Sequence, residues 1–290
     1  MDRVEAVLRE FVLAAMPGAT GALADLPLRS LLSEYGTSRS RVPEWRPRAV
    51  HVAPQLTADP RAAKVRRDAE ALIAKIEAGE DLTAYLSDRV LEPRDPGAES
   101  QPLSARRDRD LLLAEWGVHH LHLTPGHGPD LLFVAFRPDD AYVIGLYSHS
   151  DFARKGVLER MVHNWPDSEL VHKVSSGLEL SQQWSDREHK HLRENGISGP
   201  FIEVDGAVWA AASLGMAMDG TPLLVAHAAM GLAWTLDDWR EHLDERLREA
   251  AEGVDQTLGH KAVGDWEPTV HAGEIGIVRD GCFTPIGRLP

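Results

Sequence analysis

The chain has little cysteine and no long apolar run. Its single cysteine, Cys282, excludes an internal disulfide and a cysteine-rich metal site. No apolar run approaches the ~18 residues that a membrane-spanning helix requires, so we expect no contact with a membrane. The first residues are acidic and amphipathic, unlike a secretory signal, which favours a cytoplasmic protein.

The chain is also short of positive charge, with 31 Lys and Arg residues against 45 Asp and Glu residues and a formal net charge of -14. This balance argues against nucleic-acid binding through overall charge, although a local basic patch is compatible with it. Glycine-rich nucleotide-binding loops, the helical zinc-protease motif and the serine nucleophile elbow are all absent from the sequence.

The least polar sustained stretch, Trp116 to Trp165, carries six of the fourteen histidines. Alternating or continuous apolar residues predict three strands, at 118–123, 131–136 and 141–148. The short turn at 137–140 permits only an antiparallel connection, and a helical pattern follows. We therefore expect an antiparallel β-meander with a helix packed on one face.

The remaining sequence predicts an α+β fold. Helical apolar stripes occupy residues 1–91, and a stretch rich in Pro, Gly and Ser at 92–104 is typical of a linker. Residues 105–290 are then expected to form an α+β domain around the central sheet. Asp-Gly dipeptides at 205–206 and 280–281 predict further β-hairpins. A long helical stretch follows Pro222, and Thr235 with Asp238 resembles a capping box that would break it in two.

Histidine is the residue type with the most suggestive spacing. His120 and His122 share one face of the first predicted strand, His119 points to the opposite face, and His149 follows the third strand. His120, His122 and His149 are expected to converge at one end of the sheet. They would act as general acid and base, or hold a divalent metal together with a carboxylate such as Asp151. The alternative is a core histidine at position 119 and merely exposed histidines at 120 and 122.

The most basic stretch offers candidate phosphate ligands. It contains the arginines Arg39, Arg41, Arg46 and Arg48, with Trp45 among them. Arginine beside an aromatic ring is typical of phosphate and base binding. The alternative interpretation is a solvated loop whose arginines pair with the many carboxylates of the chain.

A second pair of histidines is found in the predicted helix DREHKHLREN, which Ser185 is expected to cap. Side chains two positions apart on a helix do not face each other, so His189 and His191 are poor joint ligands. We expect both of them on the surface.

The order strand, turn, strand, terminal histidine and helix resembles the hairpin core of RelE/ParE-type toxins, which are small ribosome-dependent ribonucleases and gyrase poisons. The matching residues are 131–136, Asp139 and Asp140, 141–146, and His149. The basic residues that this family carries around the hairpin are absent here. The central stretch is also similar to bacterial and prophage-encoded proteins with a GIHHLHL-like run. The resemblance to RelE/ParE-type toxins implies a toxin or phage-defence role, whereas the similarity to the GIHHLHL-containing proteins implies a shared module and no mechanism.

Three hypotheses about function follow. The favoured one is a histidine-dependent nuclease or phosphodiester-cleaving enzyme that uses no cofactor, with His120, His122 and His149 as catalytic residues and the four arginines as phosphate ligands. The second is a non-catalytic binding or assembly protein of a mobile-element or defence system, acting with a protein partner or as a homo-oligomer. The third is a histidine–carboxylate metal protein.

Overall fold

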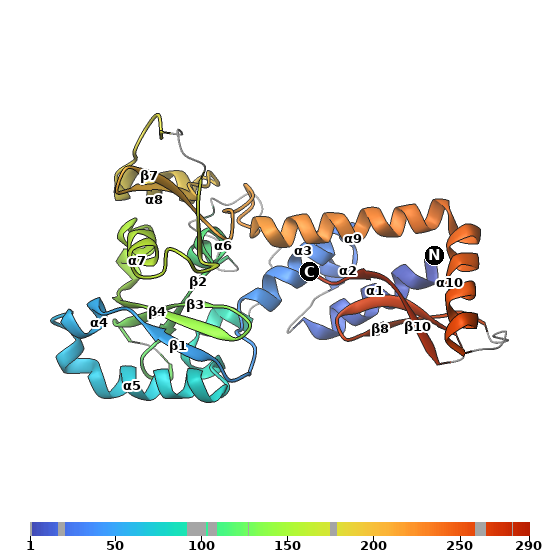
Figure 1. The fold of residues 1–290 in the computed structure, drawn as a ribbon, viewed down its shortest axis with the longest axis horizontal. Coiled ribbons are helices and arrows are strands. Elements are labelled where there is room, and N and C mark those ends of the chain that lie inside the picture. Colours follow the sequence, from blue (N-terminus) through green and yellow to red (C-terminus); the bar gives the residue numbers. More distant parts are fainter. Residues whose placement is uncertain are drawn as a thin grey trace. The chain divides into compact units, whose positions relative to one another are not determined.

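The computed structural model describes residues 2–16, 21–91, 103, 109–126, 128–174, 179–258, 265–279 and 281–290. The chain divides into two compact units, which Figure 1 shows in the colours of the sequence. The central unit is Ser40–Leu224, and the two-segment unit combines Met1–Arg39 with Val225–Pro290. This division differs from the expected one, because residues 1–91 are shared between the two units. The expected linker, 92–104, lies outside the described residues apart from Leu103.

The sheet of the central unit has the strand order β1-β4-β3-β2. Its strands are β1 (Ala49–Val52), β2 (Val118–His122), β3 (Leu131–Phe136) and β4 (Asp140–Tyr147). Strands β2, β3 and β4 form the expected antiparallel meander. Strand β1 was not expected, and it pairs in parallel with β4. This pairing explains why residues 40–91 belong to the same unit as the meander.

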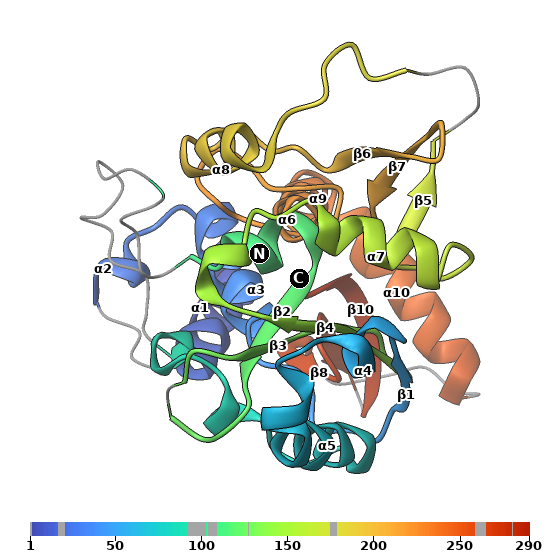
Figure 2. The same ribbon diagram turned by 90° about the vertical axis from the view of Figure 1, so that its left-hand side faces the viewer.

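Helices cover both faces of this sheet (Figure 2). One face packs on α4 (Gln55–Ala58) and α5 (Ala62–Ala78), and the other on α6 (Leu111–Trp116) and α7 (Gly156–Asn164). The period-2 alternation of β2 sends Leu121 into the α5 side and Val118 into the α7 side, as expected. The sheet is therefore buried on both faces, which accounts for the almost continuous apolar sequences of β3 and β4.

A second, smaller sheet completes the central unit. It contains β5 (Val171–Lys173), β6 (Phe201–Val204) and β7 (Ala207–Ala211) in the order β5-β7-β6. The predicted hairpin at the first Asp-Gly dipeptide is confirmed, with φ of 50° at Asp205 and 73° at Gly206, as a primed turn requires. Helix α8 (Asp186–Glu194) begins with the expected cap at Ser185. Among its described residues, this unit also contains the short 3-10 helices η1 (Thr83–Tyr85), η2 (Asp88–Leu91) and η5 (His149–Asp151).

The two-segment unit packs helices on a three-stranded antiparallel sheet. Its elements are α1 (Asp2–Ala15), α2 (Gly21–Ala24), α3 (Leu28–Ser40), α9 (Leu223–Glu241), α10 (Leu243–Leu258), β8 (Glu267–His271), β9 (Glu274–Arg279) and β10 (Cys282–Arg288). The second predicted hairpin is confirmed by the pairing of β9 with β10. The long helical stretch does break, but at His242. The expected break at Thr235 is wrong, because its hydroxyl donates to the carbonyl of Gly231 inside α9.

Among the described residues, no helix combines the length and the apolar character needed to cross a membrane.

Candidate functional site

A cavity of about 530 Å³ in the central unit is lined by His120, His122 and His149. The three histidines expected to converge therefore do so. The sheet register explains why: His122 at the end of β2 pairs with Leu131 at the start of β3, and Leu131 pairs with Tyr147 at the end of β4. The turn after β4 consequently places His149 at the same edge of the sheet as His122.

The imidazole rings lie close together around Phe152. The ring centroid of His149 is 5.5 Å from that of His122 and 6.4 Å from that of His120. The Phe152 ring lies 4.6 Å from His120 and 5.6 Å from His149. His122 is almost fully buried, whereas His149 is exposed at the edge of the cavity. The site thus combines a sheltered imidazole with one that is open to solvent.

Asp110 lies next to the Nδ1 side of the His120 ring. Its Oδ2 lies 3.2 Å from His120 Nδ1, and its Oδ1 accepts a hydrogen bond from the backbone N–H of Leu113 at the start of α6. Burial raises the pKa of this carboxyl, but the facing His120 and the Leu113 N–H outweigh it and bring the pKa to about 2. Sequence reasoning missed Asp110, although an Asp directly before an apolar helical segment is a typical N-cap.

His119 lies on the other face of β2, as expected for a core histidine. Its Nε2 is 3.0 Å from the carbonyl of Ser40, to which it donates, and its ring packs against Phe136. Burial lowers the pKa of His119 to about 4, so the imidazole is neutral at physiological pH. His119 therefore belongs to the core and takes no part in the cavity.

Several cationic side chains line the cavity. They are Arg41, Arg109, Lys190 and Arg193. Arg41 is 6% exposed, and Arg109 is fixed by a 3.1 Å hydrogen bond from Nε to the carbonyl of Asp219. Arg193 is paired with the Glu115 carboxylate, so it is the positive charge of Arg41, Arg109 and Lys190 that favours a ligand carrying a phosphate or another anion.

The structure does not bring the four candidate arginines together at this cavity. Arg46 donates to Asp139 Oδ1 at 2.6 Å. Arg48 is buried and donates to three backbone carbonyls, of which Arg137 O at 3.0 Å and Glu44 O at 2.9 Å are the nearest. Arg39 is exposed in the last turn of α3 and belongs to the two-segment unit. Arg41 alone of the four lines the cavity.

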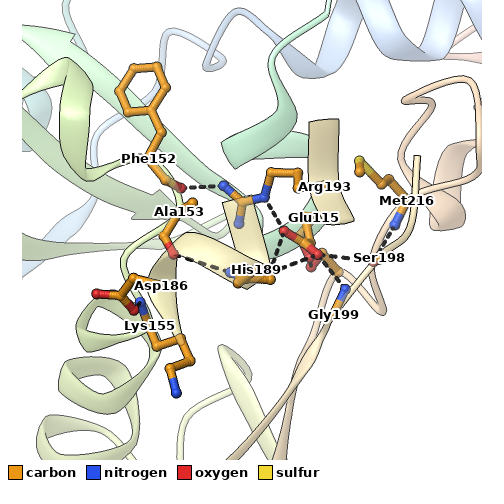
Figure 3. Close-up of polar contacts among 11 residues, drawn as sticks. Glu115, Phe152, Ala153, Lys155, Asp186, His189, Arg193, Ser198, Gly199 and Met216 are labelled. Carbon is orange, nitrogen blue, oxygen red and sulfur yellow. Dashed lines mark hydrogen bonds and ion pairs between the residues drawn. The ribbon is translucent and has the colours of Figure 1, made fainter. Parts of the chain in front are cut away.

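Figure 3 shows a buried polar network, one member of which, Arg193, also lines the cavity. Glu115 is fully buried and lies 3.2 Å from His189 Nε2, while Arg193 donates to the same carboxylate. Burial raises the pKa of Glu115, but the hydrogen bond with His189 and the charge of Arg193 prevail, so its pKa is lowered. The expectation that His189 is a surface residue is wrong, because α8 turns this side chain inward to Glu115. His191 is exposed, as expected.

The carboxylate expected to complete a metal shell has another role. Asp151 Oδ2 accepts hydrogen bonds from the backbone N–H and the hydroxyl of Ser148, both at 2.8 Å, and so closes a capping box around η5. Within the part of the chain that the structure describes, no group of three or more His, Cys, Asp or Glu side chains is arranged to hold a metal ion.

Comparisons with protein-family models, with curated proteins and with solved structures found no match to this chain. The order of β3, turn, β4, His149 and α7 on which the resemblance to RelE/ParE-type toxins depends is present. The resemblance itself stays a prediction.

Proposed function

We propose that this protein is a histidine-dependent enzyme that cleaves phosphodiesters in the cavity of the central unit. The observation that carries the proposal is the gathering of His120, His122 and His149, from two separate segments, around one cavity that Arg41 also lines. Imidazoles titrate near neutral pH and can both accept and donate a proton, which is what phosphodiester cleavage needs.

His120 is the proposed general base. The Asp110 carboxylate next to Nδ1 favours the tautomer with a proton on that nitrogen, which leaves Nε2 to accept a proton from the attacking hydroxyl group. As the new P–O bond forms, the bond to the leaving oxygen breaks, and His149 donates a proton to that oxygen. Buried His122 and Arg41 stabilise the charge that develops on the phosphoryl oxygens.

The dimensions and charge of the cavity support a nucleic-acid or nucleotide substrate. A volume of about 530 Å³ lies within the ~300–1,000 Å³ range of small-ligand sites, enough for a nucleotide-sized group. Arg41, Arg109 and Lys190 supply positive charge locally, although the whole chain carries a formal net charge of -14. Binding is therefore expected to depend on a local patch and to weaken as salt concentration rises.

The test is cleavage of fluorescently labelled RNA and DNA oligonucleotides by the wild type and by the His120→Ala/His122→Ala variant, with and without EDTA. We expect the double variant to lose at least about 100-fold in rate, as removal of general acid–base groups does. His163→Ala is the matched control, because His163 is half exposed and lies 3.3 Å from Asp205, outside the cavity lining. Equal cleavage by wild type and double variant would contradict the proposal.

The arginines offer a parallel test of phosphate binding. Arg41→Ala is expected to raise KM, because its side chain lines the cavity. Arg46→Ala is the control and should leave KM unchanged, since Arg46 pairs with Asp139. If both variants raise KM equally, phosphate is bound by the basic stretch as a whole. In bacteria, the toxin or defence role predicts that expression of the wild type slows growth and that the double histidine variant does not.

A second candidate function, a binding or assembly protein, is favoured by exposed apolar side chains. Trp234 in α9 is 63% exposed and Met218 is 82% exposed. Tryptophan and methionine are enriched at protein–protein interfaces relative to the rest of the surface. Sedimentation and affinity capture from the native host test this function, and a monomer without a partner would count against it. A cleavage activity that the wild type has and the His120→Ala/His122→Ala variant lacks would also count against it.

A further inference from the structure

We propose that Glu115, His189 and Arg193 are positioning residues that hold the turn bearing His149 against the cavity. This inference rests on the proposed function, because it assigns to the three side chains a role in placing one of its catalytic groups. None of the three was a candidate from the sequence. Figure 3 shows how they connect α6 and α8 to the segment after η5.

The carboxylate of Glu115 is the shared hydrogen-bond acceptor that orients His189 and Arg193. It lies in α6, the helix that Asp110 caps, and is fully buried. Its Oε1 accepts hydrogen bonds from Gly199 N at 2.5 Å and from Ser198 Oγ at 3.4 Å. Its other oxygen, Oε2, contacts His189 Nε2 and Arg193 Nε. A buried carboxylate with this many donors has one orientation, and it imposes that orientation on the two side chains of α8.

Each of these α8 side chains uses its other end to bind the turn. Arg193 Nη1 donates to the carbonyl of Phe152, and His189 Nδ1 lies 3.1 Å from the carbonyl of Ala153 and donates to it. Trp116 restricts both side chains further: its ring stacks on His189 at a centroid distance of 5.0 Å, and Arg193 Cζ lies 4.2 Å from its centroid. Two consecutive carbonyls directly after His149–Asp151 are thus bound by oriented donors.

The composition of α8 indicates that this attachment serves more than the fold. Nearly all its residues are polar, and its two buried residues are His189 and Arg193. Burying an ion pair gives little net stability compared with apolar residues of the same size, so stability alone does not call for charged groups here. The two polar side chains instead supply direction, because both contact the backbone that carries the Phe152 ring next to His120 and His149.

The experiment is a double-mutant cycle between Arg193 and His149. Arg193→Lys keeps the positive charge but loses the two-ended contact with Glu115 and Phe152. Single-turnover cleavage of an RNA or DNA oligonucleotide should slow about 10- to 100-fold in this variant, as small displacements of a catalytic group do, with KM changed less than about twofold. In the His149→Ala background, the same substitution should change the rate less than about twofold, because the group it positions is gone.

A matched control separates positioning from general weakening of the central unit. Leu72 is 1% exposed in α5, on the opposite face of the sheet, so Leu72→Ala lowers stability without touching the cavity. Its cleavage rate, measured well below its unfolding temperature, should equal that of the wild type. Additive effects of the Arg193 and His149 substitutions, or an equal loss in Leu72→Ala, would overturn the inference.

The same variants remain informative if the wild type does not cleave. That outcome contradicts the proposed function and leaves the positioning inference to be tested separately. In that case the position of His149 is followed by its imidazole ¹H–¹³C NMR signal. Arg193→Lys is expected to shift this signal, because the Phe152 ring beside it moves, and to leave the signal of His163 unchanged. An unmoved His149 signal overturns the positioning inference.

Discussion

Replacing Asp110 by Asn tests the electrostatic core of the site most directly. The substitution removes one negative charge and retains the helix cap, because Asn is as good an N-cap as Asp. The side chain is only 15% exposed, so the charge interacts with His120 largely out of water. A loss of stability in this variant therefore reports the Asp110 charge, and Asp110→Ala measures the further loss of the cap, about 1 kcal/mol.

The magnitude follows from the pKa of Asp110, which falls from its usual 3.8 to about 2 in the folded protein. Each unit is worth about 1.4 kcal/mol, so the ionised carboxylate stabilises the fold by about 2 kcal/mol above the unfolded pKa. Because the folded pKa is the lower one, this stability is present at pH 5 and is lost as pH falls through 4 towards 2. By pH 3 about half of it should be gone.

Urea unfolding followed by tryptophan fluorescence at pH 5 and pH 3 measures this dependence. Asp110→Asn should be less stable than the wild type by about 2 kcal/mol at pH 5 and by about 1 kcal/mol at pH 3. A difference that is the same at both pH values would refute the Asp110 charge as its source. An Asn variant as stable as the wild type at pH 5 would refute the role of the charge altogether.

Three further predictions concern the core and the backbone of the central unit. His119 should titrate by NMR with a midpoint near 4, and not near 6.5, because burial lowers its pKa. Because the unfolded chain binds this proton at a higher pH than the folded protein does, about 3 kcal/mol of stability is lost as pH falls from about 6.5 to 4. Gly79→Ala should lose more than about 1 kcal/mol in urea unfolding, because φ is 73° and the added methyl would lie 2.3 Å from the Arg46 carbonyl carbon; an unchanged midpoint would contradict this. Leu72→Ala should cost about 2–5 kcal/mol by the same measurement, and a smaller loss would mean that the core collapses around the site.

The sequence predicted those parts of the fold that local patterns specify. The meander of β2, β3 and β4 follows from apolar alternation and the turn at 137–140, and both Asp-Gly hairpins follow from turn chemistry. Strand β1 was missed because four residues among arginines carry little periodicity. Its parallel pairing with β4, about ninety residues later, has no local signal. The division into units was missed for the same reason, since it depends on contacts between distant segments.

The candidate site shows the same contrast. The convergence of His120, His122 and His149 could be predicted, because strand alternation and a short hairpin together fix which side chains share an edge. The distribution of the arginines could not, because Arg46 and Arg48 find their acceptors around Asp139 and Arg137, far along the chain. His189 was misplaced because its helix is so polar that periodicity alone did not reveal an inward face; the buried partner Glu115 is 74 positions earlier.

The two-segment unit has a consequence for how the chain acquires its structure during synthesis. Helix α1 buries Val4, Leu8 and Val12 in a core to which Ala229, Leu232 and Ile275 also contribute. A ribosome adds some 5–20 residues per second, so this apolar stripe emerges at least about ten seconds before its partners exist. During that interval the ribosome synthesises the whole central unit, and the early helices are available to chaperones or to other nascent chains.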